Sequence, residues 1–256
     1  TMTRSKRRRY GQNFLVDSDI AHRIVELLDD EPPRVLEIGP GRGALTEPLL
    51  DRFDRVRALE LDEPLVAPLE ERFRGRGLEL IHGDALSVPL DEIAGDEGTW
   101  QVASNLPYSV GTAILRRLMP RHDLFSKLVV MLQYEVALRV VAEPGEGDHG
   151  LMALERAAWT EARFAFKVDP GAFRPVPKVT SAVIVLQPRP PAEDPANIAN
   201  ALALAARALT RPRKMLSNAA GKALTAGRIE AAGIDPRIRP GELSLDDWLS
   251  LTMTHG

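Results

Sequence analysis

Short strand-like runs alternate with longer helical stretches through the first two thirds of the chain, and this alternation restricts the fold more than any other feature. The runs lie at residues 34–38, 55–60, 78–82, 100–104 and 127–132. Strands separated by helix-length segments predict a parallel sheet with crossover helices. Two more runs, at 163–168 and 179–186, follow each other without room for a helix and favour an antiparallel pair at one edge. We therefore expect an α/β, Rossmann-like sheet.

A proline-rich and charged segment at residues 187–195 interrupts this pattern and marks a linker. Behind it the sequence becomes helical, beginning with the alanine- and leucine-rich run at 201–206. We predict a main domain over residues 1–188, whose first 17 residues form a basic arm, and a small all-helical domain over residues 189–256.

The composition is that of an ordinary globular protein, with 44% hydrophobic and 27% charged residues. No apolar run approaches the roughly 18 residues of a membrane span, and the basic start lacks the apolar stretch of a secretory signal, so we expect a cytoplasmic protein. The chain has no cysteine, and none of its five histidines pairs with another at the spacing of a helical metal site. Thiolate chemistry is excluded, and we expect no metal.

The net charge of −3 does not favour nucleic-acid binding by the molecule as a whole. Binding would depend on two local basic clusters. The first runs from Arg4 to Arg9 and contains Arg7, Arg8 and Arg9. The second, in the helical tail, consists of Arg207, Arg211, Arg213 and Lys214. Taken alone, each cluster is better explained as a solvated terminus or helix face than as a phosphate-binding surface.

A glycine-rich turn at residues 39–43 follows the first predicted strand. Gly39 and Gly41 would let the backbone approach a ligand closely and direct N–H groups toward it. Glu60 ends the second strand, where one carboxylate can accept hydrogen bonds from both hydroxyls of a ribose. The same spacing fits a dinucleotide site, so an NAD-dependent oxidoreductase is an alternative, as is a turn without a ligand.

Two more strand ends carry polar groups. Asp84 and Ala85 follow the third strand, where the carboxylate can accept from the adenine amino group of a nucleoside cofactor or can simply cap a helix. The tetrapeptide Asn105-Leu106-Pro107-Tyr108 follows the fourth strand. Ligands in open α/β sheets bind outside the carboxyl ends of the strands, so these groups predict one shared site.

That tetrapeptide resembles the target-base motif of the adenine-N6 methyltransferases of RNA and DNA. Residues 10–17, 37–46 and 173–182 are similar to the ribosomal RNA adenine dimethyltransferases. Residues 213–219 and 233–244 resemble the small-subunit (16S rRNA), KsgA-type branch rather than the Erm-type branch of macrolide resistance. The resemblance covers nearly the whole chain and implies a class I methyltransferase sheet that uses S-adenosyl-L-methionine.

The resemblance also implies a pocket for the target adenine. The Asn105 side-chain oxygen and the Leu106 carbonyl can accept hydrogen bonds from its amino group and direct the nitrogen lone pair toward the methyl group. Pro107 fixes the turn and offers no competing N–H. Tyr108 can stack on the base. Phe173 would cover the opposite face, although a core position between strands explains this residue equally well.

For the cofactor, the resemblance implies contacts from five segments of the predicted main domain. They are Gln12, Asn13, Leu15, Gly39, Gly41, Glu60, Leu61, Asp84, Ala85 and Asn105. The chain departs from the family pattern in two places. His149 stands before Gly150 where an aromatic residue is usual, and Ala113 stands where the helix after the tetrapeptide usually carries proline.

The resemblance implies an enzyme that dimethylates two adjacent adenines in the 3′-terminal hairpin of small-subunit rRNA, within a precursor of the ribosomal subunit. The two basic clusters would then grip rRNA phosphates, which position a protein without specifying a sequence. We expect a monomer. Alternatives are an Erm-type enzyme acting on large-subunit rRNA and a ribosome-assembly factor that binds RNA without turnover.

Overall fold

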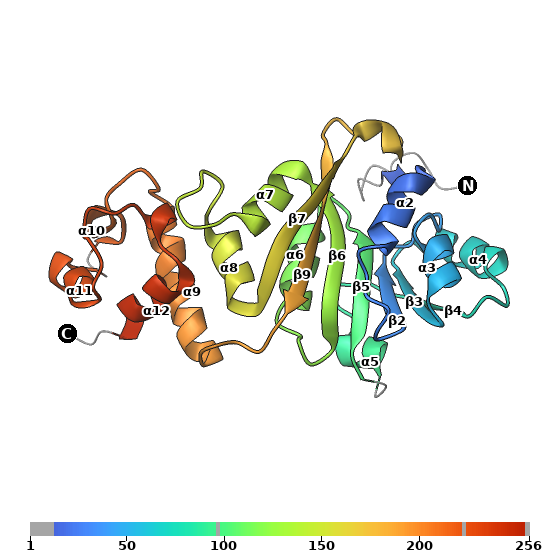
Figure 1. Ribbon diagram of the computed structural model, residues 1–256, viewed down its shortest axis with the longest axis horizontal. Helices are drawn as coiled ribbons and strands as arrows, with labels where there is room; N and C mark the ends of the chain where they lie inside the picture. The colour runs from blue at the N-terminus through green and yellow to red at the C-terminus, as the bar shows by residue number, and fades with distance from the viewer. Residues whose placement is uncertain (1–12, 96–97, 222–223, 254–256) are drawn as a thin grey trace. The chain divides into compact units, whose positions relative to one another are not determined.

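The computed structural model describes residues 13–95, 98–221 and 224–253 (Figure 1). The chain divides into two compact units, the first made of Thr1–Ala137 with Ala162–Arg189 and the second of Leu138–Glu161 with Pro190–Gly256. After Arg189 the chain passes from the first unit to the second, one residue beyond the boundary expected after residue 188. The second unit also takes the segment 138–161, which the sequence pattern did not indicate.

A seven-stranded sheet organises the first unit. Across the sheet the strands are β4 (Leu78–His82), β3 (Arg55–Glu60), β2 (Arg34–Ile38), β5 (Trp100–Asn105), β6 (Phe125–Gln133), β9 (Ser181–Pro188) and β7 (Thr160–Val168). The pairs from β4 through β6 are all parallel, whereas β9 runs antiparallel to β6. The predicted mostly parallel sheet with an antiparallel edge region is confirmed.

Crossover helices connect the parallel strands. They are α3 (Thr46–Arg52), α4 (Glu63–Arg72), α5 (Leu90–Ala94) and α6 (Gly111–Leu118). The strand order reverses between β2 and β5, because the chain leaves β2 toward β3 and later returns to its other side. A ligand site is expected at this switch point. In the described part of the chain, no helix is long and apolar enough to cross a membrane.

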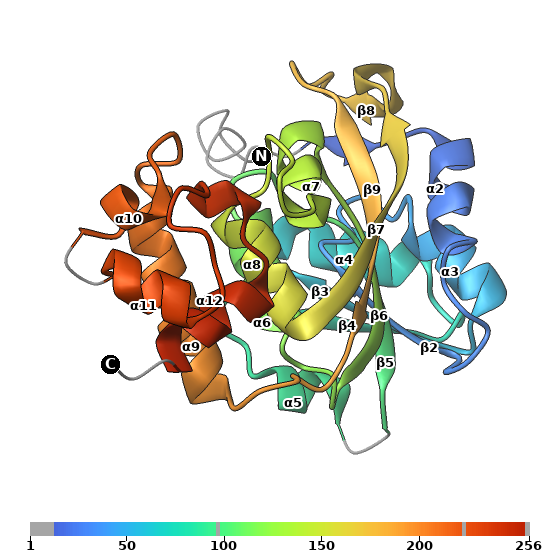
Figure 2. The ribbon, with the colours of Figure 1, turned by 60° about the vertical axis from the view of Figure 1, so that its left-hand side comes forward.

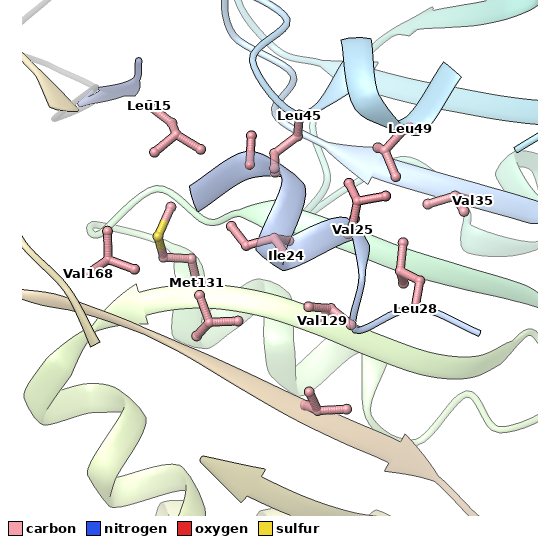
Figure 3. Close-up of a cluster of buried hydrophobic side chains, with 14 of the residues drawn as sticks. Leu15, Ile24, Val25, Leu28, Val35, Leu45, Leu49, Val129, Met131 and Val168 are labelled. Carbon is pink, nitrogen blue, oxygen red and sulfur yellow. The ribbon is translucent and has the colours of Figure 1, made fainter. Parts of the chain in front are cut away.

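Helix α2 (Ser18–Val25) closes the main hydrophobic core against the sheet (Figure 3). It begins at Asp17, whose carboxylate accepts hydrogen bonds from the N–H groups of Asp19 and Ile20 at 3.0 and 3.2 Å. Such a cap satisfies donors that have no partner within the first turn. Ile24 is fully buried in the cluster that includes Met131 of β6. Burial of this one face of α2 orders the chain just upstream of the sheet.

A second, two-stranded sheet joins β1 (Phe14–Leu15) to β8 (Phe173–Arg174), and the sequence pattern did not predict it (Figure 2). Leu15 pairs with Phe173, and both side chains are buried in the main core. Successive side chains of a strand point to opposite sides, so Phe14 is directed away from that core. This pairing fixes the segment before α2 to a loop more than a hundred residues later in the sequence.

The second unit is helical, as predicted for the tail. Its helices are α8 (Leu151–Trp159), α9 (Pro195–Leu209), α10 (Leu216–Ala219), α11 (Ala226–Ala231) and α12 (Leu245–Met253). Ala201, Ala205 and Ala208 form a buried stripe on α9, and Trp248 of α12 is buried in the same cluster. Alanines at this spacing share one helix face and let neighbouring helices approach closely.

His149, one of the two departures from the family pattern, has a structural position in this unit. Its Nδ1 lies 2.9 Å from the Gly241 carbonyl oxygen, and the Gly145 N–H donates to the same oxygen at 3.0 Å. Burial lowers the pKa of His149, which favours the neutral ring. The histidine therefore ties the loop before α8 to the turn before α12.

The core position of α2 gives a stability prediction. Ile24→Ala should lower the free energy of unfolding by about 2–5 kcal/mol, because it leaves a cavity in the closed core. Denaturant unfolding checks this. Ile20→Ala is the matched control, since Ile20 on the same helix is only partly buried and should cost less. Equal losses for the two variants would contradict the packing described here.

Candidate active site

A cavity of about 370 Å³ opens at the carboxyl ends of β2, β3, β4 and β5. This size falls within the range of roughly 300–1,000 Å³ usual for small-molecule sites. Its lining comes from five segments of the first unit, represented by Asn13, Phe14, Gly39, Gly41, Glu60, Leu61, Asp62, Asp84, Ala85, Leu86, Asn105, Leu106, Pro107, Tyr108 and Val110. The four strand ends singled out from the sequence thus meet at one cavity.

The glycine-rich turn lies directly against Glu60. Gly39 and Gly41 have φ angles of 71° and 59°, which L residues with a side chain rarely adopt. A Cβ on Gly41 would lie 3.0 Å from the ring of Phe14, so the ring would have to shift to admit one. The Gly41 N–H donates to the Glu60 carboxylate at 3.0 Å. This corrects the expectation that it points freely toward a ligand.

Glu60 is buried and receives a second backbone hydrogen bond, from the N–H of Asp62 at 2.8 Å. Burial raises the pKa of the Glu60 carboxyl, and the hydrogen bonds from Asp62 and Gly41 oppose this rise. The Leu61 N–H also opposes the rise in pKa, and an ionised carboxylate has about four acceptor positions, so capacity for a further donor remains. Neighbouring hydroxyls of a ribose are donors of the right kind.

The loop after β4 forms the next wall of the cavity. Asp84 accepts from the Leu86 N–H at 2.9 Å, which shapes the turn. Arg117 of α6 donates to the Ala85 carbonyl at 2.5 Å and to the Val88 carbonyl at 2.9 Å, and so holds the loop against the helix. Sequence reasoning missed Arg117, because nothing in its neighbourhood indicates a contact with a loop about thirty residues earlier.

Asn105 ends β5 with its amide group fixed in orientation. The amide nitrogen donates to the Asn13 carbonyl at 3.2 Å, so the other amide atom, the oxygen, is the one left to accept a hydrogen bond. The Leu106 N–H donates to the Met131 carbonyl at 3.1 Å, and the Pro107 carbonyl accepts from the N–H groups of Val110 and Gly111. The backbone of the tetrapeptide is therefore held at both ends.

The second departure from the family pattern lies at the start of α6. The helix begins at Gly111, where a Cβ would lie 3.1 and 3.2 Å from the side chains of Leu132 and Leu106. Glycine allows the helix to start close behind the tetrapeptide. Ala113 is exposed on the first turn, so the missing proline leaves no gap in the core.

Tyr108 is half-buried in the cavity wall and its hydroxyl lies 2.5 Å from the Ser181 hydroxyl of β9. Burial raises the pKa of Tyr108, so the phenol stays protonated at neutral pH. The hydrogen bond anchors the ring to the first residue of the antiparallel strand.

Two expected site positions, Phe173 and Leu15, differ from the sequence hypothesis. Phe173 is fully buried in the main core and does not line the cavity, because its pairing with Leu15 turns its side chain inward. It therefore cannot cover a base in this conformation. Leu15 instead borders a smaller neighbouring cavity of about 30 Å³. Gln12 lies outside the described residues.

The structure describes only one of the two basic clusters. Arg211, Arg213 and Lys214 are exposed in the turn between α9 and α10, within the second unit. Arg7, Arg8 and Arg9 lie outside the described residues. Among the residues that the structure describes, no group of three or more potential metal ligands comes together.

Phe14 is a residue of the cavity lining that the sequence could have indicated, since it directly follows Asn13.

Comparison with known proteins identifies the family. The family model described as ribosomal RNA adenine dimethylase matches residues 3–254. The chain belongs to the ribosomal RNA adenine dimethylase family. It is an enzyme that methylates rRNA adenines, and S-adenosyl-L-methionine is its methyl donor. A nicotinamide oxidoreductase is therefore excluded.

Individual relatives span nearly the whole chain. Proteins named ribosomal RNA small subunit methyltransferase A are 40% identical in Geobacter metallireducens, covering 96% of this chain and 94% of that protein, and 37% identical in Nitrosococcus oceani, covering 98% and 97%. The solved 23S rRNA methyltransferase ErmE is 26% identical, with a TM-score of 0.72 and coverage of 93% and 98%. A dimethyladenosine transferase from Plasmodium falciparum has the same fold, with a TM-score of 0.77 at 21% identity and coverage of 93% and 95%.

Beneath the pocket of this dimethylase lies a buried acid, Glu37 of β2. Its carboxylate accepts from the Thr46 hydroxyl at 2.6 Å, and it borders the smaller cavity together with Asn105. Complete burial raises its pKa from 4.5 to about 8, and the nearby Glu60 charge adds to the rise. The folded protein therefore keeps the proton on Glu37 at neutral pH.

Glu37 gives a pH prediction. The folded state binds this proton more tightly than the unfolded state, so its stabilisation is complete below pH 4.5 and is lost as pH rises through about 8. The free energy of unfolding should fall with pH in this window, by at most about 1.4 kcal/mol per pH unit from this group. In Glu37→Gln that part of the slope should be absent. Chemical unfolding between pH 5 and 8.5 measures it, with the exposed Glu79→Gln as control. If the free energy of unfolding depended on pH equally in wild type and Glu37→Gln, the raised pKa of Glu37 would be contradicted.

Proposed function

We propose that this dimethylase modifies the N6 amino groups of two adjacent adenines in the 3′-terminal hairpin of small-subunit rRNA, within a precursor of the ribosomal subunit. Relatives named for the small subunit match at up to 40% identity, compared with 26% for ErmE, which supports the small subunit over the large one. The observation that carries the chemistry is the Asn105 amide, oriented by the Asn13 carbonyl at the edge of the cavity.

The lining residues fit the methyl donor. Glu60 has acceptor capacity left for the ribose hydroxyls, and Asp84 offers a carboxylate to the adenine amino group. Leu61 and Leu86 are exposed apolar side chains in the lining, suited to the two faces of a purine. When bound, S-adenosyl-L-methionine supplies an electrophilic methyl group.

The remaining residues would bind the target base. An adenine amino group is a poor nucleophile because its lone pair is delocalised into the ring, so the enzyme must orient it. The Asn105 oxygen and the Leu106 carbonyl would each accept one of its hydrogens, and Tyr108 would stack on the ring. A base stacked in a helix cannot reach this cavity, so the adenine must be unpaired or flipped out.

RNA binding outside the pocket would use Arg211, Arg213 and Lys214, whose exposure suits contacts to phosphates. We propose the same role for Arg7, Arg8 and Arg9. We propose that the enzyme is a monomer. The rRNA substrate supports a cytoplasmic location.

The orientation of Asn105 gives an activity prediction. Asn105→Ala should lower kcat for methyl transfer about a hundredfold or more, because the amino group is no longer held in line with the methyl group. Single-turnover methylation with labelled cofactor measures this, and calorimetry checks that the cofactor still binds. Asn200→Ala, on the exposed surface of α9, is the control and should keep the wild-type rate. A normal kcat in Asn105→Ala would rule out this role.

The substrate is tested with ribosomal subunits that lack the modification. We expect the enzyme to add methyl groups to small subunits, with a mass gain of four methyl groups in the 3′ hairpin fragment. Transfer to large subunits alone would support the Erm-type alternative. Absence of any mass gain, with subunit maturation still supported by Asn105→Ala, would instead indicate an assembly factor.

A further inference from the structure

Three side chains of the first unit form a surface group that the proposed pocket does not use. Phe164 of β7 is 36% exposed, and its ring lies 6.1 Å from that of Tyr134, at an interplanar angle of 85°. The Lys167 ammonium lies 4.2 Å from the centre of the Tyr134 ring. We call Tyr134, Phe164 and Lys167 the aromatic–lysine cluster.

The ring of Phe164 lies at the surface of an edge strand. Phe166, two residues further along β7, packs against the main core, and the Arg23 guanidinium lies 3.8 Å from the centre of its ring. Phe164 is not a member of that core or of the buried cluster of the second unit. Strand β7 is at the end of the sheet, so one of its edges has no neighbouring strand in that sheet. The Phe164 ring is therefore accessible to a ligand that can stack on it.

Two hydrogen bonds connect the cluster to the proposed base pocket. The Tyr134 N–H donates to the Thr180 carbonyl at 3.0 Å. The next residue, Ser181, is hydrogen-bonded to the Tyr108 hydroxyl and is paired with Gln133. Tyr134 and Tyr108 are thus hydrogen-bonded to the adjacent residues Thr180 and Ser181, so the cluster lies near the wall of the cavity that Tyr108 forms.

The chemistry of the cluster suits one unpaired nucleotide. Proteins bind single-stranded RNA by stacking bases on aromatic rings and by placing cations at the phosphates. Phe164 offers the exposed ring. Lys167 offers the cation, and its cation–π contact with Tyr134 restricts an otherwise flexible side chain.

We propose that the aromatic–lysine cluster binds a nucleotide that flanks the target adenine, with its base on Phe164 and its phosphate at Lys167. Tyr134 acts as a positioning residue for Lys167. This inference rests on the proposed function, since it assigns a second contact to the same RNA. It also explains how an unpaired adenine is presented, because holding its neighbour keeps the backbone extended at the pocket.

The test compares Phe164→Leu, which keeps an apolar side chain, with Phe164→Trp, which keeps a stacking surface. The substrate is the unmodified small subunit, and a single-stranded RNA with adjacent adenines serves as a second probe. Phe164→Leu should raise KM and the Kd for the RNA probe between about fivefold and a hundredfold, as expected for one lost base stack. The cofactor Kd and kcat at saturation should not change. Phe164→Trp should remain near wild type.

Lys167→Gln tests the phosphate contact independently. It should lower the slope of log Kd against log salt by about one, as for one lost phosphate contact. Arg74→Gln, at the opposite edge of the sheet, is the charge control and should leave the slope unchanged. Thermal melting confirms that each variant is folded.

The outcomes separate the two proposals. Unchanged KM and unchanged RNA Kd in Phe164→Leu, with a wild type that methylates small subunits, would overturn the cluster and leave the proposed function intact. A wild type that methylates no small subunit would overturn the proposed function. The Kd values for the RNA probe would still show whether the aromatic–lysine cluster binds a nucleotide, because binding is measured without methylation.

Discussion

The hydrogen bonds that the Glu60 carboxylate accepts are the interaction on which the rest of the site depends. The carboxylate accepts backbone hydrogen bonds from Gly41, in the turn after β2, and from Asp62, in the loop after β3. Two loops that carry pocket residues are therefore fixed to one buried side chain. Burial raises its pKa, so the two N–H groups also help to keep the carboxylate ionised. Loss of this carboxylate would release both loops.

In the other walls of the cavity, side-chain hydrogen bonds likewise hold the segments in place. Arg117 holds the loop after β4 through two carbonyls, and Asn13 orients the Asn105 amide. Ser181 anchors the Tyr108 ring. Each hydrogen bond satisfies a polar group in a partly buried place, where an unpaired group would be costly. These contacts fix the shape of the cavity, which suits a reaction that depends on orientation rather than on an acid or base.

Much of this could be predicted from the sequence, because its signal is local. The strands at 34–38, 55–60 and 78–82 have the predicted bounds, since each is a short run that contains apolar residues and is followed by a turn or loop. Once the sheet was predicted as parallel, the convergence of the strand ends followed from topology. The family motifs then supplied the chemistry.

What could not be predicted depends on contacts between distant segments. The pairing of β1 with β8 involves strands of two residues, which are too short to show any periodicity. That pairing determines that Phe173 is a core residue rather than a cover for the base. The assignment of 138–161 to the helical unit depends on packing against α9, which no local pattern reports.

We infer that the Asn105 oxygen accepts a hydrogen bond from the amino group of the target adenine while Glu60 binds the ribose of the cofactor. A crystal structure with S-adenosylhomocysteine and adenosine bound is the decisive measurement. We expect the Asn105 oxygen to lie about 2.6–3.2 Å from the adenosine N6, and both ribose hydroxyls of the cofactor to be hydrogen-bonded to Glu60. An Asn105 amide nitrogen facing the base, or a ribose bound away from Glu60, would contradict it.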